Sequence, residues 1–152
     1  MRTGDVHLMG VAVEKIIGLR HEALRTGLPR ETAQYETDRR AIHLALFRSH
    51  SERESGKPTA CASIVRALFE GEDAWQLYGV ATAKEVRGRG YGSTLLAYCE
   101  TVIRYRKPGV YLLWCNARVS AIGFYEKHGW AAISDMFDIS TAGPHRKIIK
   151  RL

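Results

Sequence analysis

The stretch from Leu77 to Leu96 joins three patterns that together are compatible with few folds. A short apolar run comes first, then glycines at Gly88, Gly90 and Gly92, then apolar residues at helical spacing. This order predicts a strand, a glycine-rich turn and a helix. Glycine lets the backbone approach a ligand closely, and the first turn of a helix carries unpaired N–H groups. Such a junction favours an anion, most often a phosphate or pyrophosphate.

A glycine cluster between a strand and a helix can also be only a tight connection. Arg87 and Arg89 favour the anion, because they add positive charge beside the backbone donors. No Lys-Ser or Lys-Thr pair follows the glycines, and a dinucleotide fingerprint would place its third glycine one residue later. The sequence therefore argues against both a nucleoside triphosphate and NAD.

The segment Arg87–Gly92, which reads R-G-R-G-Y-G, resembles the Arg/Gln-x-x-Gly-x-Gly/Ala signature of the GNAT superfamily of N-acetyltransferases. In that family the loop holds the pyrophosphate of coenzyme A. Residues 112–130 are similar to the family's next strand and helix, in which an Asn ends the strand and a Phe-Tyr pair precedes a Gly-aromatic turn. The two motifs occur in the family's order, and the similarity is clear over residues 75–130.

The resemblance implies an α/β fold with a mixed, mostly antiparallel sheet, flanked by helices and containing a parallel pair of strands that splits. We expect one domain over residues 1–152, since this length suits a single core. The implied activity is transfer of acetyl from acetyl-CoA, the co-substrate, to a primary amine by direct attack, without a metal. Carried over by position, the coenzyme-binding residues are Val80, Ala81, Thr82, Arg87, Gly88, Arg89, Gly90, Tyr91, Gly92, Ser93, Asn116 and Ser120.

The resemblance also implies two catalytic residues. Tyr125 occupies the family's position for the acid that protonates the leaving thiolate, and Asn116 is the second. A phenol, with a reference pKa of about 10, keeps its proton at neutral pH. Considered without the family, Tyr125 has the alternative of a ring packed beside Phe124, and Asn116 has the alternative, compatible with a coenzyme contact, of a cap for the following helix. Thr82 departs from the aliphatic residue usual at its position, but the expected contact there is through the backbone.

The sequence assigns no general base. Four residues have a suitable side chain, although each is also typical of a surface or structural position: Glu70, Glu72, His128 and His145. Cys115 lies in an apolar run, so we expect an inert buried thiol rather than a nucleophile. The three cysteines are widely spaced and odd in number, which argues against a disulfide framework or a zinc site and indicates a reducing compartment.

The net charge of +7 makes a nucleic-acid-binding module one alternative. The basic residues form short clusters without a continuous tract, and part of the excess suits the phosphates of coenzyme A. A non-catalytic acyl-CoA sensor is the other alternative. No apolar run approaches the roughly 20 residues of a membrane span, and the N-terminus lacks a signal-peptide pattern. We therefore expect a cytoplasmic protein whose acceptor is a small-molecule or peptide amine, and a homodimer is left open.

The rest of the chain predicts elements in order: a strand near 6–9, a helix over 13–24, a polar loop over 30–40, strands over 41–47 and 59–69 joined by a polar hairpin connection over 49–57, a strand over 75–82, a helix over 91–106, a strand over 110–115, a helix over 119–127, and closing strands over 130–139 and 145–152. The first strands form an antiparallel meander. The 110–115 strand pairs in parallel with the 75–82 strand. The resemblance implies that the 30–40 loop shapes the acceptor pocket.

Overall fold

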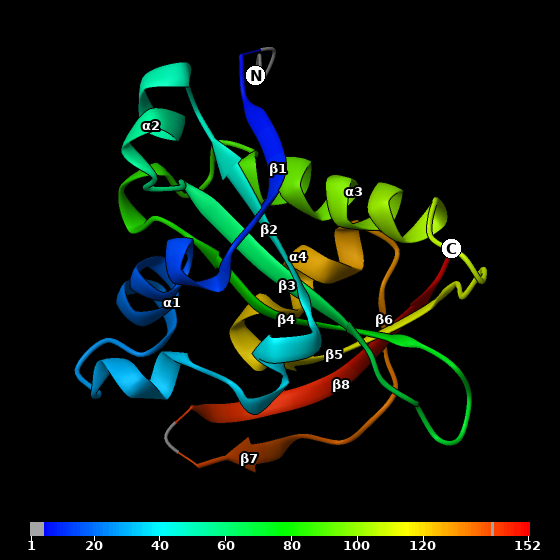
Figure 1. Ribbon diagram of the computed structural model, residues 1–152. Coiled ribbons are helices and arrows are strands. Elements are labelled where there is room, and N and C mark those ends of the chain that lie inside the picture. The colour runs from blue at the N-terminus through cyan, green and yellow to red at the C-terminus, as the bar shows by residue number, and fades with distance from the viewer. Residues whose placement is uncertain (1–4, 141) are drawn as a thin grey trace.

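The computed structural model describes residues 5–140 and 142–152, and over these residues eight strands form one sheet (Figure 1). The strand order is β1-β2-β3-β4-β5-β8-β6, and β7 pairs with β8 beside that path. The strands are β1 (His7–Val11), β2 (Ile42–Phe47), β3 (Ala60–Arg66), β4 (Trp75–Thr82), β5 (Leu112–Arg118), β6 (Ala131–Ala132), β7 (Phe137–Ile139) and β8 (Gly143–Arg151).

Helices connect and cover these strands. The α-helices are α1 (Ile17–Leu24), α2 (His50–Ser55), α3 (Tyr91–Arg104) and α4 (Ile122–Lys127). Short 3₁₀ helices are η1 (Val13–Lys15), η2 (Arg30–Ala33), η3 (Glu36–Arg40), η4 (Lys84–Val86) and η5 (Val119–Ala121). In the part of the chain that is described, no helix combines the length and apolar character needed to cross a membrane.

Among the described strand pairs, only β4 and β5 run parallel. They pair at two positions, where Trp75 lies opposite Leu113 and Gln76 opposite Trp114. Beyond these positions β4 continues along β3, and β5 continues along β8. The sheet therefore separates between β4 and β5, which confirms the predicted mixed sheet with a parallel pair that splits.

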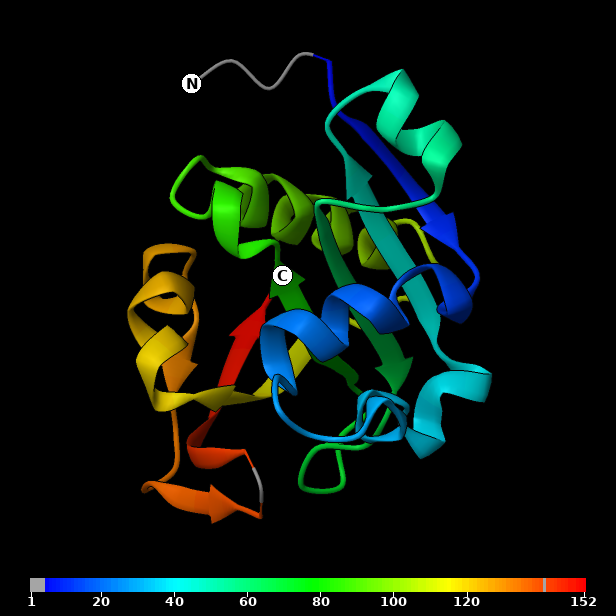
Figure 2. The ribbon, with the colours of Figure 1, turned by 90° about the vertical axis from the view of Figure 1, so that its left-hand side faces the viewer.

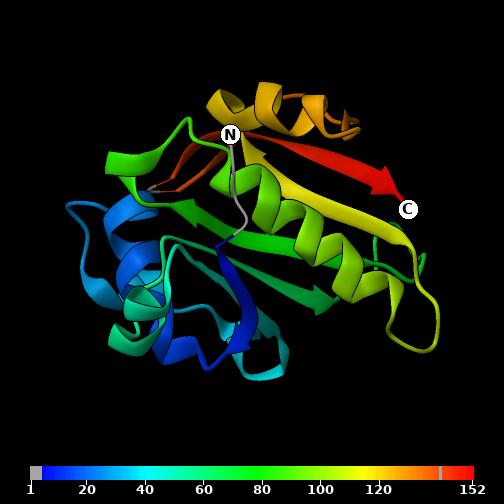
Figure 3. The ribbon, with the colours of Figure 1, turned by 90° about the horizontal axis from the view of Figure 1, so that it is seen from above.

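The alternation of side chains along the strands builds two hydrophobic layers. Leu44, Leu46 and Ala62 pack in one cluster with α3, whereas the intervening Ala45 and Cys61 pack in a second cluster with residues around α1. Helices α1 and α3 consequently cover opposite faces of the sheet (Figure 2), and α3 lies over its face roughly along the direction of the strands (Figure 3).

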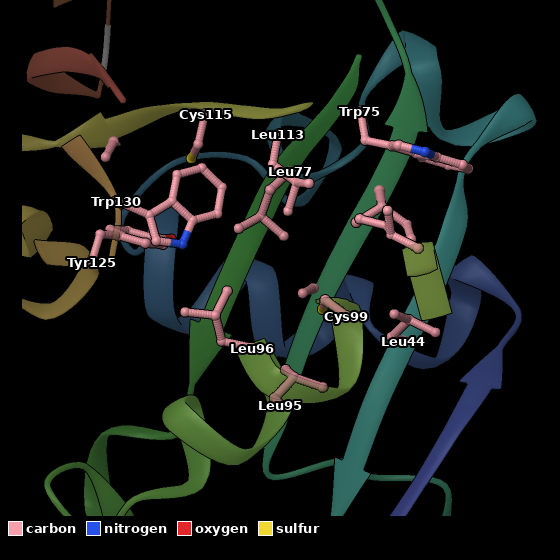
Figure 4. Close-up of a cluster of buried hydrophobic side chains, with 14 of the residues drawn as sticks. Leu44, Trp75, Leu77, Leu95, Leu96, Cys99, Leu113, Cys115, Tyr125 and Trp130 are labelled. Atoms are coloured by element: carbon pink, nitrogen blue, oxygen red, sulfur yellow. The ribbon is translucent and has the colours of Figure 1, made fainter. Parts of the chain in front are cut away.

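The larger cluster fixes the helix that follows the glycine loop. Leu95, Leu96 and Cys99 of α3 are buried and face strand residues such as Leu77 (Figure 4). Full burial of a leucine side chain stabilises a fold by about 1.5–3 kcal/mol. Burial of these apolar side chains, whose spacing is visible in the sequence, therefore fixes the start of α3 beside β4.

The predicted polar hairpin connection over residues 49–57 does join the antiparallel strands β2 and β3, but the helix within it was not predicted. The connection contains α2, whose N-terminus is capped by Ser49, because the Ser49 hydroxyl accepts from the Glu52 N–H at 3.1 Å. The Glu52 carboxylate in turn accepts from the Arg48 N–H at 3.0 Å, and Gly56 ends the helix at φ +75°. Capping chemistry, without apolar periodicity, forms this helix.

Other element boundaries also differ from the predictions. The helix over 13–24 is interrupted at Ile16, which separates η1 from α1. The 30–40 loop contains η2 and η3. The predicted strand over 110–115 instead runs to Arg118, so Asn116 lies inside β5 rather than at its end. The closing segment over 130–139 forms two short strands, β6 and β7, which both pair with β8.

Candidate functional site

Two cavities meet where β4 and β5 separate. The loop cavity, of about 590 Å³, lies against Thr82, the glycine loop and α4. The split cavity, of about 450 Å³, lies between β4, β5, the η3 segment and the β7–β8 hairpin. Both are lined by the same five residues: Leu24, Val80, Arg118, Ala121 and Tyr125. A ligand in one cavity therefore lies next to a ligand in the other.

The glycine loop requires left-handed backbone at two positions. Gly88 has φ +79° and Gly90 has φ +87°, and a Cβ at either position would meet no atom within 4 Å. Glycine is needed there for its backbone conformation rather than for space. Gly92 does not have a positive φ, and a Cβ there would lie 3.5 Å from Phe124 and Thr82, an ordinary contact.

The N-terminus of α3 faces the loop cavity without a side-chain cap. Gly90 is the N-cap residue and has no side chain to accept from the first-turn N–H groups. Tyr91, Gly92 and Ser93 all line the cavity. Uncapped N–H groups and the partial positive charge of a 14-residue helix together favour an anion at this place.

The two loop arginines differ in position. The Arg87 Nε donates to the Thr82 carbonyl at 3.3 Å, and Arg87 lines the loop cavity. Arg89 is exposed and is not among the lining residues. Ser120, also predicted for the coenzyme site, does line the loop cavity, whereas Asn116 lines the split cavity only.

The end of β4 presents one free backbone edge. Ala83 donates its N–H to the Thr59 carbonyl at 2.9 Å, so this side of the chain is occupied by the β3 segment. The Thr82 carbonyl faces the other way, where it receives Arg87. On that side, none of the described strands pairs with β4 beyond Gln76. Unpaired backbone groups at a strand edge can take an extended ligand as an added strand.

Tyr125 is both a core ring and a cavity residue. Its side chain is 5% exposed and packs against the rings of Phe124 and Trp130, with centroids 5.2 and 5.5 Å away. Burial, with Cys115 beside it, raises the pKa of the Tyr125 hydroxyl well above 10. Burial raises the pKa of the Cys115 thiol to about 12. The phenol therefore keeps its proton at neutral pH, and the neighbouring thiol has little nucleophilic character.

Asn116 does not cap the helix after β5, so the capping alternative is wrong. Its Oδ1 accepts from the Lys147 Nζ at 3.1 Å, across the β5–β8 pair. The last residue of β5 is Arg118, whose Nη2 donates to the Leu24 carbonyl at 2.6 Å. Arg118 was not singled out in the sequence, because its position depends on where α1 meets β5.

The four residues considered as a general base are found in different places. Glu72 pairs with Arg151 at 2.7 Å on the surface, and neither it nor Glu70 lines the two cavities. His128 lines the loop cavity, where its Nε2 lies 2.9 Å from the Ser93 hydroxyl. His145 is buried against the split cavity, and its Nδ1 lies 2.8 Å from the Gly143 carbonyl. In the described chain, no group of three or more His, Cys, Asp or Glu residues could hold a metal ion.

A buried ion pair supports one wall of the split cavity. Arg20, with no exposed side-chain surface, donates to both Asp38 carboxylate oxygens at 2.8 and 3.0 Å, and the Tyr78 hydroxyl donates to the same carboxylate at 2.7 Å. Burial alone would raise the pKa of Asp38, but hydrogen bonds from Arg20, Tyr35 and Tyr78 outweigh it and lower that pKa. Burial raises the pKa of Tyr78 to about 12. This network fixes the η3 segment against β4.

Comparisons with known proteins show the family and the fold. Residues 40–132 match the family model described as Acetyltransferase (GNAT) domain. The uncharacterized N-acetyltransferase YitI of Bacillus subtilis strain 168 is 31% identical over 147 residues, which are 93% of each chain. A solved structure from Lactobacillus plantarum assigned to the N-acetyltransferases has a TM-score of 0.78 at 18% identity, covering 98% of this chain and 99% of that one. The solved structure of the NatC complex bound to Gag peptide and CoA has a TM-score of 0.75 at 14% identity. The match covers 97% of this chain and 99% of that one.

Proposed function

This chain belongs to the GNAT family of acetyltransferases, and from that premise we propose that it moves an acetyl group from acetyl-CoA to a primary amine by direct attack. The observation that carries the proposal is the meeting of two cavities at Tyr125 and Val80, where the sheet separates. One cavity suits the thioester and the other suits the amine, so both reactants fit at once. A single bond exchange then suffices, without an acetylated enzyme.

The loop cavity fits coenzyme A. The left-handed glycines and the uncapped N-terminus of α3 supply N–H donors for the pyrophosphate, and Arg87 adds positive charge at the rim. The free edge of β4 from Val80 to Thr82 suits the amide-containing arm of the coenzyme. Coenzyme A would supply an acetyl group activated as a thioester. A backbone N–H near Val80 or Ala81 is the donor that we assign to the acyl oxygen.

We assign the acid role to Tyr125. As the amine nitrogen bonds to the acetyl carbon, the carbon–sulfur bond breaks and the sulfur leaves with the electron pair. The Tyr125 hydroxyl gives its proton to that sulfur, since burial keeps the phenol protonated until this moment. Solvent then restores the proton through the cavities.

We assign the base role to His145, acting on the amine directly or through one water. The Gly143 carbonyl can only accept, so the Nδ1 of His145 carries the proton of the neutral ring. The Nε2 then has a free lone pair. His145 shares the split cavity with Tyr125, whereas His128 is in the loop cavity and bonded to Ser93. A His145→Gln change removes the proton acceptor, and we expect kcat to fall about 100-fold or more.

The test combines calorimetry with a thiol-release assay. Acetyl-CoA titrated into the wild-type protein should give heat with one binding site, and Arg87→Ala should weaken binding several-fold. Arg106→Ala removes an equal charge from an exposed residue beyond the C-terminal end of α3, and it should leave binding unchanged. A panel of primary amines should then release free thiol.

Three results would contradict the proposal. Absence of heat with acetyl-CoA would exclude the coenzyme site. Binding without turnover of any amine would favour an acyl-CoA sensor. Binding to nucleic acid that weakens steeply with salt and ignores coenzyme A would favour a nucleic-acid module.

A further inference from the structure

Two arginines line the split cavity without an acidic partner. Arg25 follows α1 directly, and Arg118 ends β5. Arg118 donates from its Nη2 to the Leu24 carbonyl at 2.6 Å, and Arg25 donates from its Nη2 to the Tyr35 hydroxyl at 3.5 Å. Over the described residues, neither guanidinium forms an ion pair with a carboxylate. Most of their donors therefore remain available to a ligand.

The surroundings of this pair favour a negatively charged ligand. The Arg25 Nε is buried and donates to no atom of the described chain. Burial lowers the pKa of Arg118, and the positive charges of Arg25 and Arg87 lower it further. Glu36 is the one carboxylate among the described residues that line this cavity, and it is exposed and forms no ion pair. Two neighbouring cations without a counter-ion raise the free energy of the empty site, and an anion bound between them would lower it.

The position of the pair indicates which reactant carries the anion. Arg118 lines both cavities, as Tyr125 does, so it lies at their junction. Arg25 lines the split cavity only and is absent from the lining of the loop cavity. An anion held by both arginines is therefore on the side of the amine acceptor rather than of the coenzyme. Because the amine must lie beside Tyr125, its acidic group is only a few bonds away.

We propose that Arg25 and Arg118 bind a carboxylate of the acceptor, and that the protein acetylates amines of the amino-acid type. This inference rests on the proposed acetyltransferase function. The two guanidinium groups suit a carboxylate, because a planar guanidinium can donate two parallel hydrogen bonds to its two oxygens. Tyr35 and Tyr78, edge to face with centroids 5.5 Å apart, provide an aromatic wall for the acceptor's side chain.

The experiment compares free amino acids with their carboxamides. Each carboxamide keeps the amine and the side chain and loses only the negative charge. With the wild-type protein, we expect kcat/KM for the preferred amino acid to exceed that for its carboxamide about tenfold or more. Arg25→Gln should remove this preference, mainly through a higher KM for the acid, and Arg25→Lys should restore part of it. Arg106→Gln, which removes an exposed charge beyond the C-terminal end of α3, should keep the preference.

Calorimetry with acetyl-CoA separates this inference from the proposed function. If Arg25→Gln binds acetyl-CoA like the wild type and loses the preference for the acid, the proposed function and this inference are both supported. If acetyl-CoA binds and the amino acid and its carboxamide react equally, the inference is overturned and the acetyltransferase function stands. A tenfold loss of acetyl-CoA affinity in Arg25→Gln with an unchanged acid preference would assign Arg25 to the coenzyme and would also overturn the inference.

A binding measurement tests the carboxylate site separately from turnover. The arginine Nε–Hε signals of the coenzyme-saturated protein are recorded by NMR while glycine and glycinamide, and then larger pairs, are added. The Arg25 and Arg118 signals are assigned from the Arg25→Gln and Arg118→Gln variants. We expect both signals to shift with the amino acid and not with the carboxamide. Unshifted signals across the panel would overturn the inference.

Discussion

At the residue scale, Tyr125 has the packing of a core ring and also lines both cavities, where we propose that it acts as the acid. The ring packs in the core beside Phe124 and Trp130, and the same burial raises the pKa of its hydroxyl. A buried phenol stays protonated at neutral pH, so under the proposed function its proton is still present when the thiolate leaves. Packing and the proposed proton donation therefore depend on the same surroundings.

Tyr125→Phe removes the hydroxyl and keeps the ring. We expect kcat to fall about 10²–10⁴-fold, because general acid catalysis contributes rate increases of that order. The Kd for acetyl-CoA, measured by calorimetry, should change little. Since the pKa is raised, the acid form is present at all pH values up to and beyond 10, so wild-type kcat should show no loss from this group between pH 6 and 9. An unchanged kcat in the variant would exclude the acid role.

The three thiols permit a second prediction at this scale. Cys61, Cys99 and Cys115 are buried and free, and burial raises the pKa of each to about 12. At pH 8 the thiolate fraction is about one in ten thousand, since each pKa unit is a factor of ten. The native protein should therefore not react with an aromatic disulfide reagent over minutes. The unfolded chain should react at all three cysteines and release three equivalents of the reagent's thiol per chain. Rapid reaction of the native protein would contradict the burial of these groups.

At the scale of elements, the strand, glycine loop and helix could be predicted because each depends on its own residues. Glycines that need a positive φ and a helix with apolar spacing are local properties. Helix α2 was missed for the opposite reason, since its residues are polar and Ser49 caps it without any periodicity. The end of β5 was also placed too early, which put Asn116 at a strand end that Arg118 occupies.

A pair of alanine substitutions tests the loop. At Gly90, φ is +87°, so alanine is strained there, and we expect a loss of about 1–3 kcal/mol in the free energy of unfolding together with weaker acetyl-CoA binding. At Gly92 an added Cβ makes only ordinary contacts, so Gly92→Ala should fold and bind nearly as the wild type does. Denaturant unfolding and calorimetry measure both effects. Equal losses in the two variants would show that space, and not backbone conformation, limits this loop.

At the scale of the whole molecule, the residues that the sequence missed belong to segments that only the fold brings together. Arg25 is adjacent to Arg118 because α1 packs on the sheet face beside the split. The β5–β8 register places His145 directly opposite Arg118. No local pattern marks Arg25 or Arg118, and the sequence offered His145 only as one of four possible bases, so their places around the split depend on the topology.

The Arg20–Asp38 pair joins α1, η3 and β4, so its loss should lower the stability of the whole fold. Asp38→Asn leaves Arg20 buried without its counter-ion, and we expect the free energy of unfolding to fall by about 3–5 kcal/mol. Asp73→Asn, a matched change at an exposed carboxylate, should cost about 0.5 kcal/mol or less. Urea unfolding at pH 7 measures both changes. A small effect in Asp38→Asn would show that Arg20 is satisfied by Ala33 and Ser63 alone.

The same pair predicts how stability depends on acid. The folded-state pKa of Asp38 is below its ordinary value of 3.8, so its contribution is complete above that pH and is lost as the pH falls through the folded pKa. The stability difference between wild type and Asp38→Asn should therefore be constant from pH 7 to about 5 and shrink below about 4. A difference that instead grew on acidification would have the wrong sign.

The two cavities share five lining residues, and the rest of their walls come from different elements, so under the proposed function each reactant would occupy mostly its own space. If the proposed function holds, coenzyme A could remain bound while the acetylated amine leaves, so neither product would have to leave first. Free coenzyme A should accordingly compete with acetyl-CoA alone, and accumulated N-acetyl product should compete with the incoming amine alone. A steady-state pattern of this kind would be the kinetic signature of a sheet that opens between two of its strands.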